Sequence, residues 1–509
     1  MAEIRILQLG EEDWNDIYEL PSGIHLDYRE SFCEPPEKPY DLFFLDRLPL
    51  EEEIEPLYKS VKAYTLFVTE RAWDTAGMEY GADNNICWLY RSRKAKRIKT
   101  TDIQRFLKQE ARYFYSRPYG EKFNPRDLTI ANGFTGKIKW DGNYSVNLEG
   151  DFGKALNQIV FWRYNIVLSK GSTMDLWLEY SKSPSIMIFL TVTKFASGSI
   201  SHVVEQWKFD EKELMNVIQI DGGATDGWLF ISLSARGSGE LRITALHDRI
   251  SRGRHGYFLP GGERYVAYNR EEAFCYFEPG DLKPPLNVYF SGYKTLQGFE
   301  GYYMMKGMGC PFLLVAEPRL EGGGFYMGIA EYEQLFVTMI RKYIKELRFS
   351  SDQVILSGLS MGTFGALYYG CDIRPHAIIL GKPLASIGNV ASNEKYIRPG
   401  GFPTSLDVLH CQCGDLDIRA AERLNSRFWD KFDRTDWGNT KFAVSYMIED
   451  DYDADAYQTL LSHLRSAGAE AYGKGIHGRH NDNTGAIVNW FVMQYKKILH
   501  EDFGRKMEQ

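Results

Sequence analysis

The 509-residue chain lacks the features that mark secreted, membrane-spanning or nucleic-acid-binding proteins. No basic stretch followed by a long apolar one opens the sequence, so we expect no secretory signal. No run approaches the ~18 apolar residues that a membrane-spanning helix requires. The net charge is −8 and Lys and Arg are dense only in residues 91–97 (RSRKAKR), so nucleic-acid partners are not expected. We interpret this basic run as a solvated face, with contact to an anionic surface as the alternative.

Cysteine is scarce and shows no metal-binding or disulfide pattern. The seven thiols are scattered, odd in number and form no Cys-x-x-Cys pair, which speaks against a disulfide framework and against a zinc site. Cys411 and Cys413 are predicted to point to one side of a strand. Reduced thiols are typical of the cytosol, and we predict a cytoplasmic protein whose membrane association is peripheral, through partners.

Length and composition predict an ordinary globular α/β protein with several domains. Hydrophobic residues make up 44% of the chain and charged residues 25%, and 509 residues exceed what one core holds. Residues 1–127 read as a small α/β domain, with strands at 4–9, 41–46 and 63–69 and helices at 51–61 and 101–115. No Gly-x-Gly-x-x-Gly follows the first strand, so we expect a structural or interaction role there rather than nucleotide binding.

The middle of the chain has a different pattern of predicted secondary structure. Residues 128–255 contain short β-rich segments about ten residues apart, which is typical of an antiparallel β-sandwich. Its tryptophans suggest a carbohydrate-binding-like domain, because flat rings stack on sugars, but tryptophan in a sandwich is more often part of the core. Both interpretations stay open for Trp140, Trp162, Trp177, Trp207 and Trp228.

Residues 256–509 alternate strands with helices and predict a doubly wound α/β domain. Within it, the segment 354–367 carries the clearest catalytic signal. An apolar, β-prone run leads into Gly-Leu-Ser-Met-Gly, and small residues at helical spacing follow. This is the pattern of a nucleophile elbow, in which Gly358 and Gly362 relieve crowding around a strained turn. We therefore predict an α/β-hydrolase-like domain with Ser360 as nucleophile.

Acidic and histidine clusters follow the serine in the order that this fold uses. The strand predicted at 442–448 runs directly into Glu449, Asp450 and Asp453, and the last helix, predicted at 486–499, is preceded by His477 and His480. We choose Asp450 and His480, with Glu449 and Asp453 as alternative acids; Asp453 could instead cap the helix predicted at 456–464. A metal site on the two histidines is the competing interpretation, which the lack of further nearby histidines disfavours.

The chemistry assigns a role to each residue. His480 takes the proton of Ser360, Asp450 fixes the imidazole tautomer, and the serine forms an acyl intermediate. The oxyanion requires two donors, for which we predict the Met361 backbone N–H and one from Gly292 or Tyr293, with Tyr293 as our choice.

The chain resembles a known family over essentially its full length. The resemblance rests on four segments: ILQLGEEDW at 6–14, FSGY with GFE at 290–300, GLSMG at 358–362 and IHGRH at 476–480. The family is the second accessory Sec protein of Gram-positive bacteria that export serine-rich-repeat adhesins.

This resemblance implies two functions, export and O-acetylation, and several partners. One job is export in the cytosol, together with other accessory Sec proteins, the accessory motor ATPase and the translocon, on a glycosylated adhesin. The other is O-acetylation of the adhesin's N-acetylglucosamine, with Ser360, Asp450 and His480 at the matching positions. No bound cofactor is expected, and the acetyl donor is open. The alternatives are a carbohydrate esterase or deacetylase, and a non-catalytic export scaffold.

Overall fold

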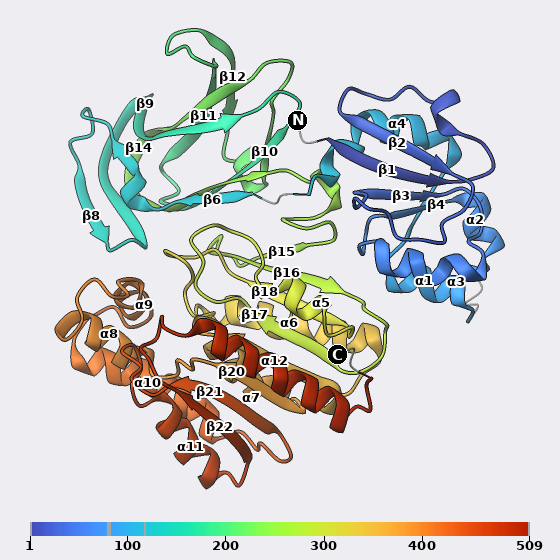
Figure 1. The fold of residues 1–509 in the computed structure, drawn as a ribbon. Helices are drawn as coiled ribbons and strands as arrows, with labels where there is room; N and C mark the ends of the chain where they lie inside the picture. The colour runs from blue at the N-terminus through green and yellow to red at the C-terminus, as the bar shows by residue number, and fades with distance from the viewer. Residues whose placement is uncertain (1–2, 79–82, 117–118, 507–509) are drawn as a thin grey trace.

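The computed structural model describes residues 3–78, 83–116 and 119–506, which form three β-sheets in chain order (Figure 1). A sheet of five strands comes first, a sheet of nine follows, and a sheet of eight completes the chain. We call them the N-terminal, central and C-terminal sheets. Helices accompany the first and last of them, so the chain is a mixed α/β protein. In the described part of the chain, no helix is both long and apolar enough to span a membrane.

The N-terminal sheet is parallel, in the order β2-β1-β3-β4-β5. Its side chains alternate between two cores, so α1, α2 and α3 cover one face and α4 covers the other. The predicted first strand is confirmed, whereas β2 and β5 were not expected. The bounds are β1 (Ile4–Leu9), β2 (Ile24–Arg29), β3 (Leu42–Leu45), β4 (Leu66–Thr69), β5 (Lys96–Ile98), α1 (Glu51–Ser60), α2 (Glu70–Thr75), α3 (Asn85–Ser92) and α4 (Ile103–Gln109).

The central sheet is antiparallel throughout and encloses its own apolar core. Strands β9 and β14 each run for 24 residues, where the sequence predicts two shorter strands in place of each. Gly153 and Gly237 take positive φ inside the long strands, and the pairing shifts register at Gly237. The bounds are β6 (Gly120–Phe123), β7 (Leu128–Ile130), β8 (Lys137–Asp141), β9 (Ser145–Leu168), β10 (Thr173–Lys182), β11 (Met187–Ala196), β12 (Val203–Phe209), β13 (Ile218–Asp221) and β14 (Gly227–Ile250).

The C-terminal sheet has the order β15-β16-β18-β17-β19-β20-β21-β22. All of its pairings are parallel except those of β16 with β15 and β18. The strands are β15 (Glu263–Val266), β16 (Glu272–Glu278), β17 (Leu286–Phe290), β18 (Phe312–Ala316), β19 (Val354–Leu359), β20 (Ala377–Gly381), β21 (Lys441–Met447) and β22 (Glu470–Ile476).

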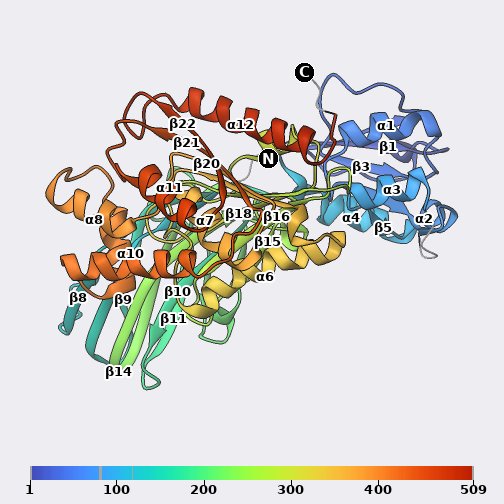
Figure 2. The ribbon, with the colours of Figure 1, turned by 90° about the horizontal axis from the view of Figure 1, so that it is seen from below.

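Helices cover both faces of the C-terminal sheet. Figure 2 shows α12 along one face and α6, α7, α10 and α11 along the other, and the two faces have separate apolar cores. Cys411 and Cys413 lie in α9, so their predicted placement on a strand is wrong; all seven cysteines are unpaired. The helix bounds are α5 (Tyr302–Lys306), α6 (Ala330–Leu347), α7 (Met361–Ile373), α8 (Ile387–Tyr396), α9 (Thr404–Cys413), α10 (Ile418–Asp433), α11 (Ala456–Ser466) and α12 (Thr484–Glu501).

The basic run at 91–97 is not a solvated face, contrary to the interpretation from sequence. Arg93 is only 3% exposed; its guanidinium donates to the carbonyl of Gly280 at 3.1 Å and lies 3.4 Å from Glu278. Lys94 pairs with Glu346 of α6. Part of the run therefore joins the N-terminal and C-terminal sheets.

Candidate active site

Ser360 sits at the sharp turn between β19 and α7. Its φ of 52° and ψ of −122° lie in a sparsely populated region, which costs on the order of 1–3 kcal/mol unless the surroundings enforce it. The turn is packed so closely that only glycine fits on either side of the serine. A Cβ on Gly358 would lie 2.3 Å from the Gly362 backbone, and a Cβ on Gly362 would lie 2.1 Å from the carbonyl oxygen of Phe290. This close packing lifts the Ser360 hydroxyl at the carboxyl end of the C-terminal sheet.

The structure brings Ser360, His480 and Asp450 together in one hydrogen-bonded chain. The Ser360 hydroxyl lies 2.8 Å from His480 Nε2, and His480 Nδ1 lies 2.8 Å from Asp450 Oδ2. His480 is only 2% exposed and Asp450 8%, whereas Ser360 is half-buried. In the tautomer with the proton on Nδ1, the imidazole donates to the carboxylate and accepts from the serine, as a general base must.

The loop after β21 holds both partners of the serine. Asp450 Oδ1 accepts the backbone N–H groups of Tyr452 at 2.9 Å and Asp453 at 3.3 Å. The backbone N–H of His480 donates to Asp451 Oδ1 at 3.1 Å, and the Tyr452 ring stacks on the imidazole with centroids 4.4 Å apart. Asp451 and Tyr452 were not singled out from the sequence, although both lie beside the predicted acid.

The two alternative acids are engaged elsewhere. Glu449 is exposed and binds His477 Nδ1 at 2.9 Å and the Gly478 backbone, so His477 faces solvent rather than the serine. Asp453 accepts the backbone N–H groups of Ala385 and Ser386 at the start of α8, not of α11. Its burial raises its pKa to about 6 despite those hydrogen bonds.

The predicted oxyanion donors lie on two segments that pack together. Among the described residues, nothing accepts the backbone N–H of Met361 or of Tyr293. Gly292 differs, because its N–H donates to Glu300 Oε2 at 2.6 Å. A Cβ on Gly292 would lie 3.1 Å from the carbonyl oxygen of Leu359, so this loop rests directly on the serine turn. The free donors are therefore those of the predicted pair, Met361 and Tyr293.

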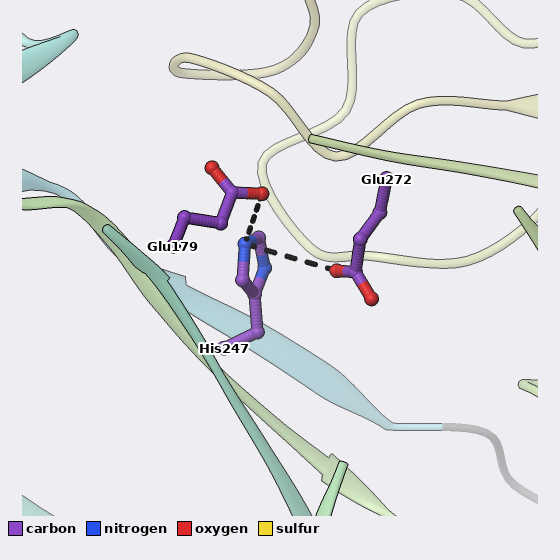
Figure 3. Close-up of side chains that lie close together, drawn as sticks. All are labelled: Glu179, His247 and Glu272. Carbon is purple, nitrogen blue, oxygen red and sulfur yellow. Dashed lines mark hydrogen bonds and ion pairs between the residues drawn. The ribbon is translucent and has the colours of Figure 1, made fainter. Parts of the chain in front are cut away.

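A second ionisable cluster lies between the central and C-terminal sheets (Figure 3). His247 Nε2 is 3.0 Å from Glu179 and 3.8 Å from Glu272. One imidazole nitrogen and two carboxylates at these distances are close enough together to bind a metal ion. Arg249 and Arg264 already bind Glu272. Burial acts to raise the pKa of Glu272, but Arg249 and then Arg264 outweigh it and bring this pKa to about 2. Since two guanidinium groups repel a cation, we interpret the cluster as an ion network that joins the sheets.

The five tryptophans do not form one sugar platform. Trp162 is buried in the central core, and Trp177 is buried with its Nε1–H on the carbonyl of Arg270. Trp228 stacks on Phe195, while Trp140 is 45% exposed on β8. Trp207 is half-buried against the central core, so tryptophan in this sheet serves mainly packing.

The comparisons with known proteins cover nearly the whole chain. The family model described as the accessory Sec system GspB-transporter matches residues 4–505. An accessory Sec system protein of Streptococcus gordonii is 36% identical over 514 residues, with 99% of each chain covered. Another, from Staphylococcus aureus, is 37% identical over 520 residues, with 99% of this chain and 98% of that one covered.

A solved structure agrees with these sequence matches. A chain of the Glycosylation Associate Protein (Gap123) complex from Streptococcus agalactiae is 36% identical and superimposes with a TM-score of 0.88, over 99% of both chains. Such identity over the full length goes well beyond a shared serine motif. The chain belongs to the family of accessory secretory protein 2, of the accessory Sec system.

Proposed function

We propose that this chain serves adhesin export and also transfers acetyl groups to N-acetylglucosamine on the exported serine-rich-repeat glycoprotein. Family membership supports the export role. One observation carries the enzymatic role: Ser360, His480 and Asp450 are linked by two 2.8 Å contacts at a strained turn. The strand order, with β19 leading into this turn, supports an α/β-hydrolase-like domain.

In the first half-reaction, Ser360 attacks the carbonyl carbon of an acetyl donor. The hydroxyl proton passes to His480 Nε2, and Asp450 stabilises the resulting imidazolium. The backbone N–H groups of Met361 and Tyr293 donate hydrogen bonds to the carbonyl oxygen and stabilise the negative charge that develops on it. When the intermediate collapses, the bond to the leaving group breaks, His480 returns the proton to that group, and acetyl-Ser360 remains.

In the second half-reaction, a sugar hydroxyl takes the place of the leaving group. His480 removes its proton as its oxygen attacks the acetyl carbon, and the proton then returns to Ser360 when the serine ester breaks. Water in the same position would make the enzyme an esterase. We propose transfer rather than hydrolysis because the resemblance to the family implies a sugar acceptor; the buried His480 and Asp450 would serve either reaction.

The proposed partners follow from the family. They are other accessory Sec proteins, the accessory motor ATPase, the translocon and the glycosylated adhesin. The similar Streptococcus agalactiae chain is part of a complex, which supports the first of these. We place the protein in the cytoplasm, at the membrane through its partners, with the acetyl donor as a co-substrate.

The test is a Ser360→Ala variant expressed in a strain that makes the adhesin. We expect mass spectrometry of the adhesin glycans to show loss of acetyl groups, while the variant still purifies with its accessory Sec partners. Ser466→Ala, which alters an exposed serine of α11, is the matched control and should leave acetylation unchanged.

Three results would contradict the proposal in different ways. Unchanged glycan mass in Ser360→Ala would remove the enzymatic role and leave a non-catalytic export component. Release of acetate by the purified protein without transfer to a sugar would make it an esterase. Normal export in a strain that lacks this chain would remove the export role.

A further inference from the structure

One lysine of the basic run faces a cavity instead of a neighbouring carboxylate. Side chains alternate along the edge strand β5, which lies near α4 in Figure 2. Arg97 pairs with Asp74 of α2, whereas Lys96 lines a cavity together with residues of α4. The cavity beside Lys96 has a volume of about 350 Å³. Its walls come from β4, from β5, from α4 and from the connector that follows β14, which contributes Arg254 and His255. Segments far apart in the sequence thus line it.

The acidic groups of this cavity are already paired. Glu110 binds Arg254 through two contacts of 2.8 Å and His255 at 2.9 Å. Asp102 lies 3.3 Å from Arg105, one turn along α4. These carboxylates therefore neutralise the arginines beside them and leave the lysine charges of the cavity uncompensated.

Lys96 carries a positive charge without a counter-charge. In the part of the chain that the structure describes, no carboxylate oxygen lies within 4.0 Å of its ammonium, and the face of Phe67 is 5.8 Å away. Burial, and then Arg254, lower the pKa of Lys96, and Glu110 opposes them only in part. Burial and the charge of Lys96 likewise lower the pKa of His255, to about 4, so this imidazole is neutral near pH 7. A half-buried, unpaired ammonium is unfavourable unless an anion completes it.

We propose that this cavity binds a phosphate group, with its oxygens on the Lys96 ammonium and with Lys99 and Arg254 at the mouth. Phosphate fits because it is anionic at neutral pH, both as a monoester and as a diester, and because it offers several acceptor oxygens to converging donors. His255, whose Nε2 is bound to Glu110, forms part of the cavity wall beside Lys96. The phosphate is carried either by a soluble compound or by a phospholipid headgroup. In both cases it would contact residues of the N-terminal sheet and of the connector after β14.

The test is titration of the full-length protein with inorganic pyrophosphate by calorimetry, and with phosphatidylglycerol vesicles by co-flotation, against phosphatidylcholine vesicles. We expect saturable binding of at least one phosphate probe. Lys96→Gln should weaken it about tenfold or more, because a charge-assisted hydrogen bond is lost. Lys38→Gln, which removes an exposed charge elsewhere on the same domain, should bind like the parent protein.

The outcomes separate the two sources. If the protein binds pyrophosphate and Lys96→Gln weakens this binding, the phosphate belongs to a soluble compound. If the protein binds only the anionic vesicles and Lys96→Gln abolishes their flotation, the phosphate belongs to a lipid headgroup. Failure of both probes to bind, or equal binding by Lys96→Gln and Lys38→Gln, would overturn the proposal. Lys96→Gln should also keep or raise the thermal unfolding midpoint, since no ion pair is lost, which guards against a folding artefact.

Discussion

The carboxylate of Glu300 accepts the backbone N–H of Gly292 at 2.6 Å, in the loop that follows β17. This contact places an acid beside the turn of Ser360, where negative charge would develop during acyl transfer. It also withdraws Gly292 from the possible oxyanion donors and leaves the neighbouring Tyr293. Glu300 therefore shapes the loop rather than taking part in proton transfer.

Substitutions at Glu300 separate its charge from its hydrogen bond. We expect Glu300→Gln, whose amide oxygen still accepts from Gly292, to keep kcat within about threefold of the parent. Glu300→Ala frees the loop and should lower kcat by about tenfold to a hundredfold, because small displacements of catalytic donors are costly. Hydrolysis of an activated acetyl ester measures both. A parent-like rate for Glu300→Ala would show that the loop needs no such tether.

Paired variants test the choice within each cluster of the predicted triad. His480→Ala and Asp450→Asn should lower kcat for the acetyl ester by at least about a thousandfold, since His480 takes the serine proton and Asp450 holds the imidazole in the tautomer that accepts it. His477→Ala and Glu449→Gln disrupt only an exposed pair and should stay within about twofold. If His477→Ala were as damaging as His480→Ala, the assignment of the base would be wrong.

Asp453 should make stability depend on pH. Its pKa is about 6 in the folded protein because it is buried, against about 4 for an unfolded Asp. The folded state thus holds the proton more tightly, and the free energy of unfolding falls as the pH rises through about 6. Asparagine can accept the same two N–H groups without ionising. We expect Asp453→Asn to raise the free energy of unfolding by up to about 3 kcal/mol at pH 8 and by about half as much at pH 5, with a corresponding rise in the unfolding midpoint.

Thermal unfolding at the two pH values measures this difference. Asp430→Asn, at an exposed carboxylate of α10, is the control and should shift neither midpoint appreciably. A stabilisation by Asp453→Asn that is equal at pH 5 and pH 8 would speak against burial of a charge as its cause.

The ion network that Arg249 and Arg264 form with the cluster of Figure 3 should contribute strongly to the junction of the central and C-terminal sheets. Glu272→Gln leaves Arg249 and Arg264 buried without their anion, so we expect destabilisation of about 3–5 kcal/mol. Urea unfolding provides the measurement. Glu149→Gln, which breaks an exposed pair with Lys137, should cost less than about 1 kcal/mol. Comparable effects of the two substitutions would contradict a buried network.

The sequence by itself determined the turn that carries Ser360, because residues close to one another in the chain specify it. A β-prone run, two glycines and small residues dictate the strand, the strained turn and the helix within 14 residues. The order of serine, acid and histidine along the chain also follows from the strand-and-helix pattern. The resemblance of four short segments, in turn, pointed to the family.

Only the tertiary structure decided matters that depend on contacts between distant segments. Glu449, Asp450 and Asp453 are chemically alike and nearly adjacent, so the path of one loop decides which of them meets His480. The partner of Gly292 lies eight residues away across a loop. The glycines of β9 and β14 lie at irregular positions of the ladder because these two strands continue to pair with each other before and after them. The basic run likewise looks solvated in isolation, yet Arg93 is buried by a sheet that begins some 170 residues later.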